Sequence, residues 1–218
     1  MNKLTLTAVA ALFLSALAPA AWAQDAKAGE KKAAMCIGCH GIPGYQASFP
    51  EVHKVPMISG QNAKYIVAAL TAYKKGDRRH PTMRATAATM NDQDMADLAA
   101  FYESNGRDDG GGAAAQASRE PSPQVAELLK KANCASCHGV NFSKPIDPSY
   151  PKIAGQHADY LFVALKSYQV EKGGAVGRNN AIMAGMAKQY TLPELKLLAK
   201  YLGSLDGELK TVPQSRFR

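Results

Sequence analysis

The sequence of 218 residues contains only four cysteines and one tryptophan, and aromatic residues make up 7% of it. Beyond the N-terminus it has no apolar run of the ~18 residues that a membrane-spanning helix requires. It also lacks the sustained alternation of apolar and polar residues that is typical of half-buried strands. These absences argue against an integral membrane protein and a β-sheet protein. A hydrophobic fraction of 46% excludes a mostly disordered chain.

The N-terminal residues have the pattern of an export signal. Lys3 supplies a positive charge, residues 4–17 are almost entirely apolar, and the Ala-Trp-Ala of residues 21–23 fits a cleavage site. A membrane anchor is the alternative, but the apolar stretch is short and no charged stop-transfer flank follows it. We therefore expect residues 1–23 to be a cleaved signal peptide and the mature protein to reside in the periplasm, an oxidising compartment.

The charge balance favours acidic partners without selecting one. The net charge of +8 comes from 26 Lys and Arg against 18 Asp and Glu. Residues 124–218 hold 13 basic and 7 acidic side chains, whereas residues 24–105 hold 10 and 8. We expect the C-terminal half to contribute more to docking an acidic partner through electrostatic steering.

The second half of the chain repeats the first. Three segments recur in the same order at offsets of 95–98, namely MCIGCHG and NCASCHG (35–41 and 133–139), PMISGQ and PKIAGQ (56–61 and 151–156), and YIVAALTAY and YLFVALKSY (65–73 and 160–168). Ordered matches of this kind indicate two homologous tandem domains, at residues 24–105 and 124–218. Residues 106–123 are rich in Gly, Ala, Ser and Pro, which predicts a flexible linker that stiffens at its proline end.

Both halves have the apolar spacing of helices. We expect helices over 28–34 and 65–73 in the first half and over 125–132 and 160–168 in the second. A further helix is expected after Asn91, a good N-cap with Asp94 three residues on, and after the capping box of Thr191 and Glu194. The fold class is therefore all-α.

A histidine follows each pair of cysteines, in CIGCH and CASCH. This spacing is the attachment signature of c-type haem. Cysteines three apart on a helical turn can form thioethers with the two vinyl groups of one porphyrin, and the adjacent histidine can then ligate the iron. The predicted covalent attachment residues are Cys36, Cys39, Cys134 and Cys137, and the predicted proximal ligands are His40 and His138.

Three other readings of the four cysteines remain. A four-thiolate zinc site would have to join pairs that are far apart in the sequence and would leave both histidines unexplained. A thioredoxin-like dithiol needs a βαβ context that the sequence lacks. Structural disulfides also leave the trailing histidines without a role.

Taken together, these motifs resemble the dihaem cytochrome c4 family. The resemblance rests on CIGCH and CASCH, the P-x-I-[SA]-G-Q segments, the YxxxAL helices and the methionines before the last helix of each half, and it covers essentially the whole mature chain. It implies two tandem class I cytochrome c domains, each wrapped around one covalently bound haem c. It also implies His–Met ligation of each iron and one-electron transfer, with electrons passing between the two haems.

Repeat symmetry selects the distal ligands. Methionine thioether is a common sixth ligand of electron-transfer haem, but methionine is also a common core residue. Met83 and Met183 each lie eight residues before a helix N-cap, so we predict these two as axial ligands. Met90 and Met186 are the alternatives. We expect Met95 in the core, and Met57 has a lysine as its repeat partner.

The resemblance further implies that a proline carbonyl accepts a hydrogen bond from each proximal histidine. Pro56 and Pro151 match by position, with Pro50 as a rival because the first half carries extra residues near 51–55. A turn before the next helix is their alternative role.

The remaining basic and histidine residues have less specific readings. We expect His53, His80 and His157 at the surface, since none has a histidine as its repeat partner. Residues 74–79 (KKGDRR) could form a docking patch or a solvated loop.

The resulting hypothesis is a periplasmic electron carrier and not an enzyme. The resemblance implies a quinol-oxidising complex or a dehydrogenase as donor and a haem–copper oxidase as acceptor. It implies no nucleic-acid partner and at most peripheral association with the membrane. The alternatives are a dedicated electron-transfer subunit of a larger dehydrogenase and a dihaem peroxidase or thiosulfate-oxidising enzyme.

Overall fold

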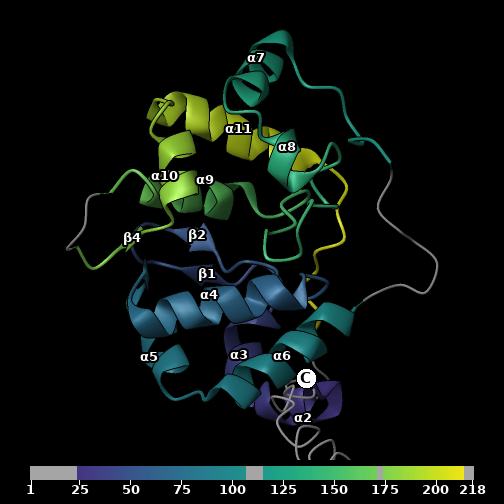
Figure 1. Cartoon of the computed structure of the whole chain (residues 1–218), viewed down its shortest axis with the longest axis vertical. Coiled ribbons are helices and arrows are strands. Elements are labelled where there is room, and N and C mark those ends of the chain that lie inside the picture. The colour runs from purple at the N-terminus through teal and green to yellow at the C-terminus, as the bar shows by residue number, and fades with distance from the viewer. Residues whose placement is uncertain (1–23, 107–114, 171–173, 214–218) are drawn as a thin grey trace, which may run out of the picture.

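The computed structural model describes residues 24–106, 115–170 and 174–213. The expected signal peptide and residues 107–114 of the expected linker lie outside the described residues. The described chain forms two helical halves, one above the other in Figure 1, which follow each other in the sequence.

The first half contains five helices among its described residues: α2 (Ala26–Lys32), α3 (Ala34–His40), α4 (Ala63–Lys75), α5 (Pro81–Ala88) and α6 (Asp92–Ser104). The second half contains α7 (Pro123–Lys131), α8 (Ala135–His138), α9 (Ala158–Ser167), α10 (Ala181–Ala187) and α11 (Leu192–Ser204). A helix lies in each region where the sequence predicts one, although the helix expected over 28–34 is divided at Ala33 into α2 and α3. The short helices α5 and α10 are additional findings.

Local side chains define the beginnings of the last helix in each half. Asn91 and Asp94 form a reciprocal capping box at the start of α6, and Thr191 and Glu194 form the same arrangement at α11. Each box satisfies two backbone N–H groups that a helix otherwise leaves unpaired.

Each half has its own apolar core. In the first half α2 crosses α6 so closely that a Cβ on Gly29 would lie 2.0 Å from the carbonyl oxygen of Asp97, so only glycine fits there. Met95 is 1% exposed within this core, as the sequence predicts. In the second half α9 and α11 pack together around Leu161, Ala199 and Leu202.

Four strands of two residues each accompany the described helices: β1 (Gln46–Ala47), β2 (His53–Lys54), β3 (Arg78–Arg79) and β4 (Gly177–Arg178). β1 and β2 form an antiparallel pair within the first half, whereas β3 and β4 pair antiparallel across the two halves. Such short strands leave no alternating pattern in the sequence, and the fold remains helix-dominated.

The chain crosses between the halves again near its C-terminus. After α11 it descends beside the first half (Figure 1), where the backbone N–H of Lys210 donates to the carbonyl of Ser59 at 3.0 Å. Gly60 has a φ of +82°, and a Cβ on it would collide with the carbonyl oxygen of Glu208. Lys152 is buried and its Nζ donates to the carbonyl of Gly60 at 2.8 Å and to the carboxylate of Glu208. The C-terminal segment therefore fastens the second half to the first.

The described part of the expected linker packs on the second half. Ser118 accepts a hydrogen bond from the backbone of Asp206 at 2.7 Å, and the carbonyl of Arg119 accepts one from Tyr201 at 2.8 Å. Ser122 caps α7, which begins at Pro123 inside the predicted linker. Helical structure therefore begins earlier than the composition indicates, because proline at a first helical position favours it.

Among the described residues, no helix combines the length and the apolar character needed to cross a bilayer.

Candidate haem sites

Each CxxCH motif lies on a short helix of its half. Residues 36–40 lie in α3, and residues 134–138 begin at the N-cap of α8 and run to its end. One helical turn therefore separates the two sulfurs of each pair and places the histidine at the end of the helix. No disulfide joins any of the four cysteines, and each is of intermediate exposure.

The two cysteine pairs lie in different halves. Among the described residues, no group of three or more His, Cys, Asp or Glu side chains is arranged to hold a metal ion. The geometry gives no support to a shared four-cysteine zinc site.

A backbone carbonyl fixes the tautomer of each motif histidine. Nδ1 of His40 lies 2.9 Å from the carbonyl oxygen of Pro56, and Nδ1 of His138 lies 3.0 Å from that of Pro151. Because a carbonyl can only accept, Nδ1 carries the proton. The contact in the first half is with Pro56 and not with its rival Pro50.

Burial keeps both imidazoles neutral. It lowers the pKa of His40 and of His138, and the proline hydrogen bonds oppose it only in part. A neutral ring that is protonated on Nδ1 presents the lone pair of Nε2, which is the form that binds a metal.

An apolar cavity in the second half brings the predicted haem residues together. Cys134 and His138 of the CASCH motif and Met183 of α10 all line it, although they come from two separate segments of the chain, whereas Cys137 is not part of the lining. The other lining residues are almost all apolar: Ala132, Ile153, Leu165, Met186, Ala187, Tyr190, Leu195, Leu198 and Leu202. The donor set and its apolar walls fit a covalently attached haem with histidine and thioether ligands.

The first half has a matching apolar cluster. Cys36 and Met83 both pack against its core, together with Ile58. Leu70, Met90, Met95 and Leu98 belong to the same core, and the repeat relates these positions to cavity-lining residues of the second half.

The predicted methionine ligands lie on the two helices that sequence reasoning missed. α5 begins with Pro81, which favours a first helical position, and carries Met83 in its first turn. α10 has Asn180 as its N-cap, whose side chain accepts from the backbone N–H of Met183 at 3.0 Å. The alternative in this helix, Met186, is 36% exposed but also lines the cavity, whereas the alternative Met90 is buried.

Two arginines and four tyrosines meet where the halves join. Arg78 and Arg178 face each other in the β3–β4 pair, and both donate to the hydroxyl of Tyr160, at 2.7 and 3.1 Å. Arg78 also donates to Tyr65 at 3.2 Å and lies over the ring of Tyr73, while Arg178 lies over the ring of Tyr168. Each arginine comes five residues before a predicted methionine ligand, and this spacing is the sequence signal that could have revealed them.

The prediction that residues 74–79 form a docking patch or a solvated loop is wrong for the two arginines, which lie between the halves. Arg78 and Arg79 form β3 at the interface, and Nε of Arg78 is buried. Lys74, Lys75 and Asp77 of that segment are exposed, whereas both arginines are of intermediate exposure.

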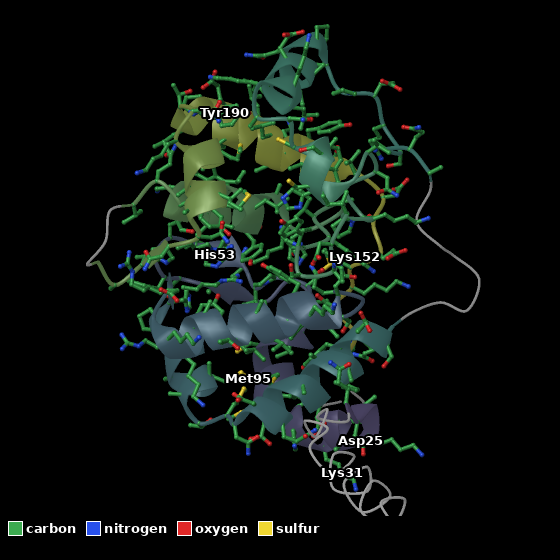
Figure 2. The ribbon with its side chains drawn as sticks, viewed as in Figure 1. Asp25, Lys31, His53, Met95, Lys152 and Tyr190 are labelled. Carbon is green, nitrogen blue, oxygen red and sulfur yellow. The ribbon has the colours of Figure 1, made fainter. Side chains whose placement is uncertain are left out.

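The placement of His53 at the surface is also wrong. His53 is 5% exposed, and Figure 2 shows it between the two halves, where its ring lies against Tyr160. The extra residues of the first half form the β1–β2 hairpin, from which the backbone of Lys54 donates to Asp159 in the second half at 3.1 Å. His80 and His157 are of intermediate exposure.

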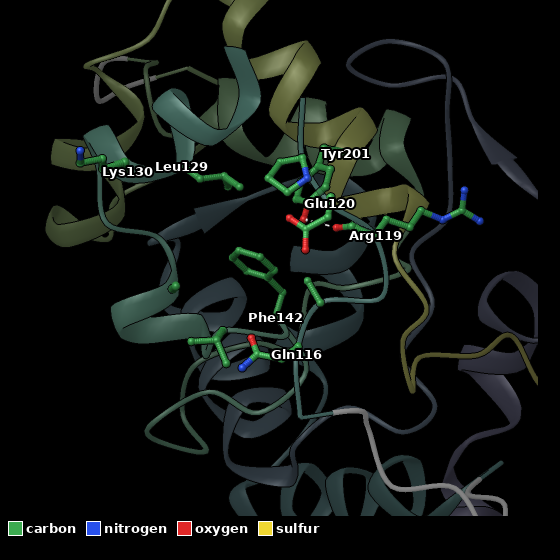
Figure 3. Close-up of a pocket in the computed structure, with 11 residues that line it drawn as sticks. Gln116, Arg119, Glu120, Leu129, Lys130, Phe142 and Tyr201 are labelled. Carbon is green, nitrogen blue, oxygen red and sulfur yellow. Dashed lines mark hydrogen bonds between the residues drawn. The ribbon is translucent and has the colours of Figure 1, made fainter. Parts of the chain in front are cut away.

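A larger pocket of about 440 Å³ lies between residues 116–121 and the second half (Figure 3). Phe142, Leu129 and Tyr201 form part of its wall. Its lining contains no histidine, cysteine or methionine, although it includes Ala135 of the CASCH motif.

Comparison with known proteins identifies the family. The sequence pattern of the cytochrome c family matches the chain twice, over residues 26–105 and 124–206. Cytochrome c4 of Azotobacter vinelandii is 29% identical over 94% of this chain and all of its own length. A thiosulfate dehydrogenase electron acceptor of Stutzerimonas stutzeri is 30% identical over 92% of this chain and 94% of its own. The structure of Acidithiobacillus ferrooxidans cytochrome c4 is 25% identical, with a TM-score of 0.57 over 79% of this chain and 99% of its own.

With two cytochrome c domains in tandem and this full-length similarity, the chain belongs to the dihaem cytochrome c4 family. The protein is therefore an electron-transfer cytochrome with two covalently bound haem c groups.

Proposed function

We propose that each half holds its haem with its own motif and its own methionine. Cys36 and Cys39 attach the first haem, with His40 and Met83 as axial ligands. Cys134, Cys137, His138 and Met183 serve the second in the same roles. The observation that carries this proposal is the convergence of Cys134, His138 and Met183 on one apolar cavity, and the packing of Cys36 and Met83 against the core of the first half supports it.

The proposed ligation makes the protein an electron carrier and not an enzyme. A haem held at each site by these residues would supply reversible one-electron redox chemistry, and the histidine and methionine would leave no ligand position of the iron open to substrate. The protein's residues fix the ligands and exclude water, because the cavity walls are apolar. Binding of cyanide or peroxide to the oxidised protein at neutral pH would reveal an open iron position and favour a dihaem enzyme instead.

The carrier is proposed to work in the periplasm, between a quinol-oxidising complex or a dehydrogenase and a haem–copper oxidase. The apolar signal pattern of residues 1–23 supports export. The basic excess of the C-terminal half supports docking of an acidic partner there. The exposed Lys196 and Lys200 on α11 offer a test, with Lys27 and Lys31 on α2 as controls. Charge reversal at α11 should slow electron transfer to an acidic acceptor more than charge reversal at α2.

A second candidate is a dedicated acceptor for one dehydrogenase. It is favoured by the similarity to a protein named as the electron acceptor of thiosulfate dehydrogenase. Co-purification of the protein with a catalytic subunit, and reduction by that subunit faster than by other donors, would support this role.

A further inference from the structure

Gln61 of the first half and Gln156 of the second half each form hydrogen bonds with the backbone of the opposite half. Oε1 of Gln156 accepts from the backbone N–H of Met57 at 3.0 Å, and its Nε2 donates to the carbonyl of Met57 at 2.8 Å. Gln61 makes the same pair of bonds with the backbone of Lys152, at 2.9 and 3.0 Å. Both side chains are 4% exposed, so water does not compete for these bonds.

The glutamines bind the peptide groups that also bind the proximal histidines. The N–H of Met57 and the carbonyl of Pro56 belong to one peptide group, and that carbonyl accepts from Nδ1 of His40. In the same way, the peptide group between Pro151 and Lys152 lies between His138 and Gln61. A single peptide group therefore connects each histidine to a glutamine of the opposite half.

The orientation of each glutamine amide is determined by its neighbours. Oε1 of Gln156 also accepts from the backbone N–H of His157 at 3.0 Å, and Oε1 of Gln61 accepts from that of Asn62 at 3.0 Å. Reversing either amide would place its NH₂ group against two N–H donors and its oxygen against a carbonyl. Oε1 of each glutamine therefore faces the N–H of the peptide group whose carbonyl binds the proximal histidine.

We propose that Gln61 and Gln156 are positioning residues, each of which tunes the proximal histidine of the opposite domain. This inference rests on the proposed ligation of haem by His40 and His138. A hydrogen bond at the N–H of an amide makes its carbonyl a better acceptor, because consecutive hydrogen bonds polarise one another. A better acceptor at Nδ1 makes the imidazole more basic and more electron-donating. Each glutamine therefore favours the oxidised iron of the other domain and lowers its potential.

The arrangement also links the domains energetically. Any movement that separates the two halves breaks both glutamine contacts and weakens the hydrogen bond to each histidine. We infer that docking of the domains lowers both potentials through the same two side chains.

The test uses Gln156→Met and Gln61→Met in the full dihaem protein, because methionine keeps the length of the side chain and removes its amide. Redox titrations followed by the haem methyl NMR signals report each domain separately. Gln156→Met should raise the midpoint potential of the first haem, with a smaller change in the second, and should shift the Nδ1–H resonance of His40. Gln61→Met should do the reverse, at the second haem and His138.

A matched control is Asn62→Leu. The side-chain amide of Asn62 also forms a hydrogen bond with the opposite half. It donates to the carbonyl of Tyr150 at 3.3 Å, and not to a peptide group that binds a proximal histidine. This variant should leave both potentials near their original values. Gln156→Asn and Gln61→Asn, which withdraw the amide by one methylene group, provide a second pair of variants should the methionine forms not fold.

Equal shifts of both haems in each variant, shifts of the haem in the glutamine's own domain, or no shift would overturn the proposal. Haem content and the axial-ligand spectrum are recorded on the same samples. A protein that lacks two histidine–methionine haems contradicts the proposed ligation, whereas intact haems with unchanged potentials contradict only the role of the glutamines.

Discussion

Arg78 and Arg178 lie directly opposite each other in the antiparallel pair of β3 and β4, one from each half of the chain. Two like charges so close together are unfavourable unless other groups compensate. The hydroxyl of Tyr160 accepts from both guanidinium groups, and the rings of Tyr73 and Tyr168 lie under them. The junction between the domains is therefore built on an arginine pair held by tyrosines.

Tyr160→Phe tests this junction. The change removes the acceptor shared by Arg78 and Arg178, so the free energy of unfolding should fall by about 1–3 kcal/mol, the cost of leaving such donors unsatisfied. Denaturant unfolding followed by circular dichroism measures the change. Tyr45→Phe, at a 42% exposed tyrosine, is the control and should have little effect. Equal stability of the two variants would show that Tyr160 does not hold the pair.

Because of Tyr160, we expect the free energy of unfolding to gain a contribution in mild alkali. Burial opposes ionisation of Tyr160, but Arg78 and Arg178 outweigh it and lower its pKa to about 8. The unfolded chain ionises near pH ~10, so this contribution is complete above that pH and is lost as pH falls through about 8. The stability difference between wild type and Tyr160→Phe should therefore grow from pH 8 to 10. Ultraviolet difference spectra that show no tyrosine ionising below its ordinary range would refute this.

Met183→Leu distinguishes the two methionines of α10. Leucine cannot ligate iron, and a thioether ligand raises the potential, so one of the two haems should lose its Met–Fe band and fall in potential. Met186→Leu is the matched control, because it lines the same cavity from the next helical turn. Loss of the band in Met186→Leu and its retention in Met183→Leu would reassign the ligand.

We expect Asp97 to make a contribution to the stability of the first domain that is lost in acid. Its side chain is buried, which opposes ionisation. A 2.7 Å contact with Lys32 and hydrogen bonds from the backbone of Asp25 and from Gln93 nevertheless hold its pKa below the usual value. The stabilisation is present above pH ~4 and is lost as pH falls through the lowered pKa.

Asp97→Asn should accordingly lower the free energy of unfolding at neutral pH by about 1–3 kcal/mol. The deficit should shrink as the pH falls below 4, because the wild-type carboxylate is then protonated as well. Thermal unfolding of both proteins across this range measures it. A deficit that is constant with pH would contradict the role of the charge.

Local signals in the sequence predict the helices and the repeat well. The capping pairs of Asn91 with Asp94 and Thr191 with Glu194 act within one turn, so their effect does not depend on the rest of the fold. The cysteine and histidine spacing is equally local. Pro56 could be matched by position only because the two halves repeat each other.

The junction could not be predicted in the same way. His53 becomes buried because a hairpin places it against the other domain, and Arg78 pairs with a strand 100 residues away. The C-terminal segment binds Ser59 through backbone atoms, which no side-chain pattern reveals. These contacts join distant parts of the chain, and two-residue strands are too short to produce a periodic signal.

The most direct test of the account is an optical spectrum of the purified protein, with a pyridine haemochrome count and the near-infrared band of methionine-ligated ferric haem. The account predicts two haem c groups per chain, both with histidine–methionine ligation. A single haem, a haem that is not covalently attached, or the absence of the methionine band would contradict it.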